Sequence, residues 1–245
     1  MPHSIEWIFF DCFNTLIDDF DEDGDESGLG PMQHLPVEAG LYSTVYELRR
    51  DYLDWREQNL TSQAREIPIQ DRLTALLKRR APDYPRDQRA ALVAQMVDCF
   101  LESYESDLRL PAGVLDMLTY WQGKVSMGVV SNFHVSALPE RLLEKFGLRS
   151  YLKFVVDSAE CGYRKPSTEI YSIAAHAANL RIEDYSKVLF IGDHLLNDVL
   201  TPQSLGMSAI HFDRSLERPR SAPTPKNIPS IRGWANFRSL PPVSL

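Results

Sequence analysis

The sequence is short of three things: cysteine, long apolar segments and positive charge. Its three cysteines, Cys12, Cys99 and Cys161, stand far apart and include no CxxC pair. They argue against a disulfide framework or a zinc site and are typical of reduced thiols in a cytosol. No apolar run approaches the roughly 18 residues of a membrane-spanning helix, and no basic segment followed by an apolar one opens the chain. The net charge of -8 disfavours nucleic acid and membrane surfaces as partners, since both are anionic.

What remains is the composition of an ordinary globular protein. Of the 245 residues, 44% are hydrophobic and 24% are charged. This length is sufficient for one large domain or for a core with a smaller domain. Because signs of export, membrane insertion and nucleic-acid binding are missing, we expect a cytoplasmic protein that acts on a small molecule, as a monomer or a homodimer.

An apolar run near the start of the chain stops at a carboxylate. Five of the six residues at positions 5–10 are apolar, and Asp11 follows them. Such a run is typical of a strand that is buried on both faces. A charge at the end of a buried strand is tolerated when it is paired, binds a metal or takes part in chemistry. Taken alone, Asp11 is therefore either a functional carboxylate or a turn-forming residue.

Three later segments also bring a polar side chain to the end of an element. Residues 125–130 lead to Ser131, residues 188–192 lead to Asp193, and Lys165 stands before a proline ahead of a helical pattern. Strands that alternate with helices predict a doubly wound parallel sheet of the α/β class. Because the carboxyl ends of parallel strands meet at one edge, we expect these side chains to gather there.

In order and spacing, these four segments resemble the four motifs of the haloacid dehalogenase superfamily, over about residues 5–213. The resemblance implies a Rossmann-like core and a transfer reaction at an aspartate. Such a reaction needs an anionic nucleophile, a hydroxyl that holds the transferred group, and a cation against its charge. The resemblance assigns these roles to Asp11, Ser131 and Lys165.

The resemblance also implies a Mg²⁺ site and further contacts to the transferred group. Carboxylate and carbonyl oxygens are the ligands that Mg²⁺ prefers. The implied metal-binding residues are Asp11, Phe13 through its backbone carbonyl, Asp193, and Asp198 directly or through water. Thr15 and Asn132 are implied to contact the transferred group.

Phe13 departs from the pattern of the superfamily's phosphatases. Those enzymes usually carry a second aspartate two residues after the nucleophile, which protonates the leaving oxygen and then activates water. A phenyl ring can do neither. The superfamily's haloacid dehalogenases have an aromatic residue there, because halide leaves without a proton. His134 and His194, which follow motif positions, are candidates for replacing the missing acid or base.

Three functional hypotheses remain. The favoured one is a Mg²⁺-dependent phosphatase of small phosphomonoesters that forms an aspartyl-phosphate at Asp11. Asp193 and Asp198 support it, because burying a pair of carboxylates without a cation costs several kcal/mol. The second hypothesis is a 2-haloacid dehalogenase, which Phe13 supports. The third is a non-catalytic protein that keeps the fold and binds a ligand.

Between the first two motifs lies a long helical pattern. Apolar residues at spacings of three and four predict helices between residues 41 and 108. The resemblance implies that residues 18–109 form a helical cap inserted into a core of residues 1–17 and 110–245. Such a cap excludes water from the site and contacts substrate.

The remaining stretches carry less specific patterns. Arg49, Arg50 and Arg56 either bind a substrate anion or form the solvated face of a helix, which is the simpler interpretation. The acidic loop at residues 18–30 partly matches an EF-hand calcium loop but lacks its final glutamate, so a solvated loop is preferred. Residues 214–227 are expected to form a loop without a chemical role.

Overall fold

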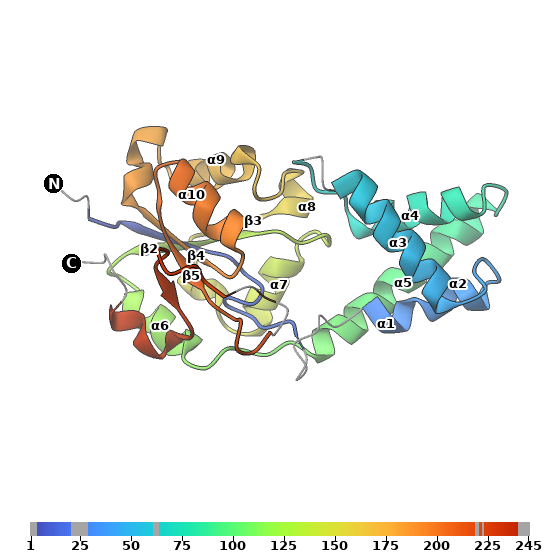
Figure 1. The fold of residues 1–245 in the computed structure, drawn as a ribbon, viewed down its shortest axis with the longest axis horizontal. Coiled ribbons are helices and arrows are strands. Elements are labelled where there is room, and N and C mark those ends of the chain that lie inside the picture. Colours follow the sequence, from blue (N-terminus) through green and yellow to red (C-terminus); the bar gives the residue numbers. More distant parts are fainter. Residues whose placement is uncertain (1–3, 21–28, 61–63, 219–220, 222, 240–245) are drawn as a thin grey trace.

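The computed structural model describes residues 4–20, 29–60, 64–218, 221 and 223–239 (Figure 1). Its centre is a parallel sheet with the strand order β3-β2-β1-β4-β5-β6. The strands are β1 (Trp7–Phe10), β2 (Ser126–Ser131), β3 (Phe154–Asp157), β4 (Val188–Gly192), β5 (Ser208–Phe212) and β6 (Ser230–Ile231). The doubly wound α/β fold that the sequence predicts is confirmed, with the first strand in the middle of the sheet.

Both faces of the sheet are buried, and this explains the continuous apolar runs. Successive side chains of a strand point to opposite faces. Ile8 and Phe10 pack with α6 (Val114–Trp121) and α7 (Leu138–Lys145), whereas Phe9 packs with α9 (Thr168–Ala177). A strand between two helical layers therefore needs an apolar residue at nearly every position.

Short elements complete the core. They are α8 (Ser158–Cys161), α10 (Thr201–Ser204), 3-10 turns at Arg149–Tyr151, Ile182–Lys187 and Trp234–Ser239, and a π-helical turn at Leu195–Leu200. The last strand of the sheet is the two-residue β6, which pairs with β5 and has no counterpart among the apolar runs of the sequence. Two residues are too few to produce a recognisable hydrophobic period.

The segment between β1 and β2 forms a helical insertion, as predicted. Figure 1 shows its helices grouped at one end of the molecule, beyond the helices that cover the sheet. They are α1 (Leu29–Met32), α2 (His34–Glu38), α3 (Val45–Leu60), α4 (Ile69–Arg80) and α5 (Arg86–Ser106). The chain enters and leaves this insertion side by side, because Asp18 and Arg109 exchange two backbone hydrogen bonds of 2.8 and 3.2 Å. The division of the chain at residues 17 and 110 stays a prediction.

Two expectations concern features outside the sheet. Most of the acidic loop with partial similarity to a calcium site, residues 21–28, lies outside the described residues. Within the described part of the chain, no helix has both the length and the apolar character that a bilayer span requires.

Candidate active site

Polar side chains from three strand ends and one loop meet at the carboxyl edge of the sheet. The Nζ atom of Lys165 lies 2.6 Å from Oδ1 of Asp11 and 2.7 Å from Oδ1 of Asp198. One carboxylate oxygen from each of Asp11, Asp193 and Asp198 lies within 4.8 Å of the others. Ser131 ends β2 beside them and is fully buried. The parallel sheet thus brings together side chains that are far apart in sequence, as expected.

A tight turn after β1 positions Asp11. The amide of Asp11 donates to the carbonyl of Ile191 at 2.9 Å and so extends the pairing of β1 with β4. Asn14 adopts a φ of 60°, a left-handed conformation that asparagine tolerates. The turn brings the Thr15 hydroxyl to 3.3 Å from Oδ2 of Asp11. The indole Nε1 of the buried Trp234 donates to the Thr15 carbonyl at 3.0 Å, so the C-terminal segment also holds this turn.

Asn132 holds the backbone of Lys165. Its Nδ2 donates to the Lys165 carbonyl at 2.9 Å, and its Oδ1 accepts from the Lys165 amide at 2.7 Å. Both ends of the side-chain amide are therefore used to fix Lys165. In this structure Asn132 is a positioning residue, and its predicted contact with a transferred group stays a prediction.

Asp198 occupies space that only a glycine leaves open. A Cβ atom at Gly192 would lie 2.4 Å from Cγ of Asp198, far inside contact distance. The amide of His194 donates to Oδ2 of Asp198 at 2.9 Å, while Oδ1 accepts from Lys165. The end of β4 and the following π-helical turn thus place this carboxylate against the lysine.

The hydroxyl of Ser131 differs from the polar groups described above in its hydrogen bonding. It is buried, and it has no hydrogen-bond partner among the described residues. Buried polar groups are normally hydrogen-bonded, so an exception needs an explanation. A hydroxyl that contacts a bound group explains it.

The cluster carries more negative charge than its lysine balances. Burial raises the pKa of Asp11 to about 6, against the opposing effect of Lys165. Burial, and then the charges of Asp11 and Asp198, raise the pKa of Asp193 well above its ordinary value. Burial would lower the pKa of Lys165, but the two carboxylates outweigh it and raise this pKa, so the ammonium stays protonated. Carboxylate oxygens with surplus negative charge, buried at Asp11 and Asp198 and half-buried at Asp193, fit a divalent cation such as Mg²⁺.

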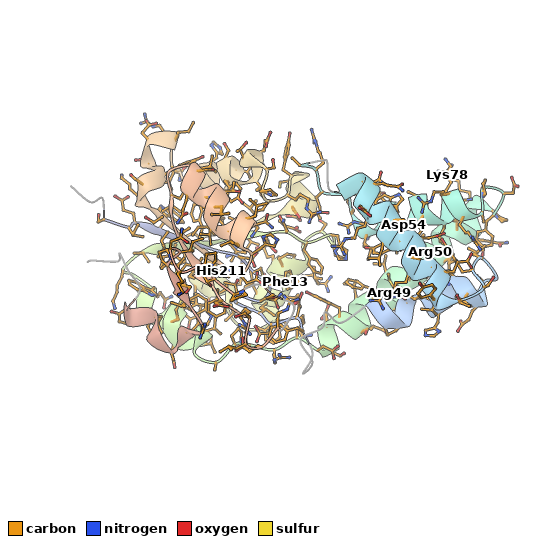
Figure 2. All side chains as sticks on the ribbon, viewed as in Figure 1. Phe13, Arg49, Arg50, Asp54, Lys78 and His211 are labelled. Carbon is orange, nitrogen blue, oxygen red and sulfur yellow. The ribbon has the colours of Figure 1, made fainter. Side chains whose placement is uncertain are left out.

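Phe13 packs into an aromatic cluster that joins the core to the insertion. Its ring centroid lies 4.5 Å from that of Phe133, after β2, and 5.8 Å from that of Tyr104, on α5. Figure 2 shows Phe13 in the part of the core that faces the insertion. The position at which related phosphatases carry an acid is thus filled by a buried ring.

Two arginines near the cluster were missed by the sequence analysis. Arg218 reaches from the loop after β5 to Asp193, with 3.7 Å between its Nη1 and Oδ2. The buried Arg214 lies 2.8 Å from Oδ1 of Asp18. Both belong to the loop that was expected to carry no chemistry. The only sequence signal was the position of this loop after a core strand, since its charges alone are typical of a solvated surface.

His211 was missed as well. Its Nε2 lies 2.8 Å from the backbone carbonyl of Asp193, and its Nδ1 lies 2.6 Å from the Thr224 hydroxyl. His211 sits in β5, beside the end of β4, and therefore supports the loop that carries Asp193.

The two histidines that were candidates for the missing acid or base have other contacts. His134 stacks on Phe133 at 4.6 Å between ring centroids and lies 5.3 Å from the ring of Phe100. Burial, assisted by three nearby arginines, lowers its pKa well below the ordinary value and keeps it neutral. His194 is exposed, and its Nδ1 accepts from the Asn197 amide at 3.3 Å as a helix cap. His194 reaches Asp198 through its backbone amide, and within the described part of the chain neither imidazole ring hydrogen-bonds a carboxylate of the cluster, so the acid-base role of both histidines stays a prediction.

The arginines of the first long helix separate into two groups. Arg49 and Arg50 are exposed, and Figure 2 shows both on the insertion, away from the core. Arg56 is also exposed, but it acts electrostatically on His134 and Arg164 of the core. The simpler interpretation of a solvated helix face therefore fits Arg49 and Arg50.

A parallel sheet with a nucleophile-like aspartate, a buried lysine and an acidic pair at its carboxyl edge defines a hydrolase core with a helical insertion. The chain belongs to the haloacid dehalogenase-like hydrolases, because the model of this family matches residues 5–206. The resemblance seen in the sequence is confirmed.

The curated relatives found match less than half of this chain. The pyrimidine 5'-nucleotidase YjjG of Escherichia coli K12 is 33% identical over 96 residues, which are 39% of this chain and 41% of that protein. The chain matches less than half of the length of each of the curated relatives found.

Two solved structures share the fold over nearly their whole length. The 2-haloacid dehalogenase from Pseudomonas syringae pv. Tomato has a TM-score of 0.71 at 19% identity, over 96% of this chain and 97% of that one. The HAD-hydrolase YfnB from Bacillus subtilis, bound to magnesium, has a TM-score of 0.61 at 20% identity, over 99% and 100%. At such identities the similarity concerns the fold alone.

His134→Gln should reduce the acid sensitivity of the fold. The pKa of His134 is lowered from 6.5 in the folded protein, so the unfolded chain takes up the proton first as pH falls. This contribution to stability is complete above pH 6.5 and is lost as pH falls below it. Urea unfolding between about pH 7 and about pH 5 should give a shallower loss of unfolding free energy in the variant. His176→Gln, at an exposed position of α9, is the control, and equal slopes in all three proteins would contradict the assignment.

Proposed function

We propose that the protein is a Mg²⁺-dependent phosphatase of small phosphomonoesters that forms an aspartyl-phosphate at Asp11. The observation that carries this proposal is the cluster of Asp11, Asp193 and Asp198 around Lys165, whose negative charge exceeds what one lysine balances. The similarity to a nucleotidase, which also releases phosphate, adds support.

Asp11 supplies the nucleophile. A carboxylate oxygen attacks the phosphorus, the new bond to Asp11 forms, the bond from phosphorus to the leaving oxygen breaks, and the leaving oxygen takes a proton from water, because Phe13 supplies none. A second water then attacks the phosphorus and the bond to Asp11 breaks. That water releases one proton to the hydroxide left by the first step, and inorganic phosphate leaves with the carboxylate regenerated. The Thr15 hydroxyl, 3.3 Å from Oδ2, orients this carboxylate and reaches the transferred group.

Lys165 and Ser131 receive the charge of the phosphoryl group. The ammonium of Lys165 stays protonated between two carboxylates, so it reduces the repulsion between Asp11 and an anionic substrate. The Ser131 hydroxyl, which has no other partner among the described residues, donates to a phosphoryl oxygen. Asn132 keeps Lys165 in place through its two backbone hydrogen bonds and lies next to the same group.

The metal-binding residues would come from two segments, the turn after β1 and the segment after β4. Mg²⁺ would stabilise the negative charge that collects on the transferred group. The residues that would hold it are Asp11, Phe13 through its backbone carbonyl, Asp193 and Asp198. Asp198 is already fixed by the His194 amide, and the carbonyl of Asp193 is held by His211.

A 2-haloacid dehalogenase is the second candidate, and Phe13 is the observation that favours it. In that reaction a carboxylate oxygen of Asp11 attacks carbon and halide leaves, so no proton donor is needed. The acidic cluster counts against this candidate. A metal-free reaction leaves three carboxylates against Lys165 and Arg218, and burying this surplus of negative charge costs several kcal/mol.

Asp11→Asn should abolish hydrolysis of nitrophenyl phosphate, because an amide is neither a nucleophile nor a good metal ligand. We expect a loss of at least about 10³-fold in kcat with Mg²⁺, and a similar loss in the wild type after chelation. Asp116→Asn, at an exposed position of α6, should behave as the wild type. A wild-type rate in Asp11→Asn contradicts the proposed function. A rate of the wild type that stays unchanged after chelation also contradicts it.

Gly192→Ala should weaken metal binding without changing any metal ligand, because the new Cβ would displace Asp198. Thermal unfolding with increasing Mg²⁺ measures this directly, since a ligand of the folded state raises the melting temperature. The wild type should show the rise and Gly192→Ala should lose most of it. Gly233→Ala, where a Cβ meets no atom within 4 Å, is the control. An undiminished rise in Gly192→Ala would remove Asp198 from the metal site.

Phe13→Asp should restore a proton donor for the leaving oxygen. A positioned acid contributes about 10²–10⁴-fold, so the gain should be largest on alkyl phosphates and small on nitrophenyl phosphate, whose leaving group needs no proton. Phe13→Asn is the matched control, because it removes the same ring without adding an acid. Both variants lose the aromatic contacts, at a cost of about 3–5 kcal/mol, so folding must be verified. Equal rates of the two folded variants on every phosphate would favour the dehalogenase.

A further inference from the structure

A short strip of the insertion joins the core directly beside the proposed active site. The amide of Glu66 donates to the carbonyl of Gly162 at 3.2 Å, and the amide of Arg164 donates to the carbonyl of Ala64 at 3.0 Å. The amide of Ile69 donates to the carbonyl of His134 at 2.8 Å. Gly162 and Arg164 precede Lys165 by three positions and one position, and His134 follows Ser131 by three. The seam that these backbone contacts form therefore borders the reacting groups.

The carboxylate of Glu66, in the seam, lies beside two guanidinium groups. The side chain of Glu66 is only 2% exposed. Its Oε1 lies 2.5 Å from Nη2 of Arg72, and its Oε2 accepts from the Ser158 hydroxyl at 2.9 Å and lies 3.8 Å from Nε of Arg164. Both oxygens of Glu66 are therefore occupied, and its single charge is shared by two cations.

A third guanidinium group comes from α3. Arg56 lies one helical turn after Tyr52, and residues four apart share a helix face. The Tyr52 hydroxyl accepts from Nη1 of Arg72 at 3.4 Å, so this face of α3 borders the seam. Among the described residues, the charges that act on Arg164 are those of Glu66, Arg72 and Arg56.

The seam thus brings three cations near one anion, and two of the three are accessible to solvent. Arg56 is exposed, and the side chain of Arg164 is 27% exposed. Burial lowers the pKa of Arg164, Glu66 opposes this shift, and Arg72 and Arg56 lower the pKa further; the part due to the two arginines is the electrostatic cost of collecting like charges there. An anion in the seam would remove this cost, and guanidinium groups bind carboxylates and phosphates through paired hydrogen bonds.

We propose that the seam of Arg56, Arg72 and Arg164 binds a second anionic group of the substrate, a carboxylate or a second phosphate on the phosphomonoester. Arg164 is adjacent to Lys165, with about 3.8 Å between their Cα atoms. The proposal therefore requires a substrate that places its transferred group at Asp11 and extends a second anion to the seam. This inference rests on the proposed phosphatase function and names its substrate class.

The direct test compares ligands that differ only in the second anion. Phosphonoacetate, phosphonopropionate and phosphonobutyrate are titrated calorimetrically in the presence of Mg²⁺, each against the alkylphosphonate of equal length. Phosphonates are not hydrolysed, so binding is measured apart from turnover. The wild type should bind at least one carboxylated member about tenfold more tightly than its partner, as expected for one charged hydrogen-bonded contact.

Variants assign the preference to the seam. Arg56→Gln and Arg164→Gln should bring the ratio of the two affinities close to one, whereas Arg164→Lys should keep part of it. Arg50→Gln is the control, since this residue lies on the same helix, is 58% exposed and stands away from the core (Figure 2).

The outcomes separate the two proposals. Equal affinities within every pair for the wild type, or a preference that survives both glutamine variants, would overturn the role of the seam and leave it as a structural ion-pair network. Failure of the wild type to bind any phosphonate, together with no hydrolysis of nitrophenyl phosphate, would overturn the phosphatase function itself.

Discussion

The contact between Lys165 and the carboxylates of Asp11 and Asp198 is the interaction on which the site depends. It joins residues 154 positions apart and is buried, so its charges must balance within the protein. Several local features serve this balance, including the asparagine that holds the lysine backbone and the glycine that leaves room for Asp198. The surplus negative charge that remains is what the proposed metal would neutralise.

The insertion contacts core residues next to the acidic cluster. Tyr104 on α5 contacts the ring of Phe13 and donates from its hydroxyl to Oδ2 of Asp19 at 2.9 Å. The seam around Glu66 forms a second connection, to the loops that carry Ser131 and Lys165. Movement of the insertion would therefore alter the aromatic cluster and the arginine seam together, while the sheet keeps Asp11 and Lys165 in place.

The fold and the centre of the site could be predicted because they follow from local pattern. A buried parallel strand needs a continuous apolar run, so the strand ends at Asp11, Ser131 and Asp193 can be read from the sequence. The contacts of Arg218 and the arginine seam could not, because they depend on how distant loops pack. An arginine in a polar segment has the same local pattern whether it faces solvent or a carboxylate.

The most direct test of the central claim is mass spectrometry of the peptide that contains Asp11 after acid quenching of turnover with a phosphomonoester and Mg²⁺. The proposed mechanism predicts a peptide heavier by one phosphoryl group on Asp11, absent in Asp11→Asn and absent with chelator. An unmodified Asp11 under rapid turnover would contradict it. So would incorporation of oxygen from labelled water into the Asp11 carboxylate during turnover of a 2-haloacid, because that result requires an ester to carbon.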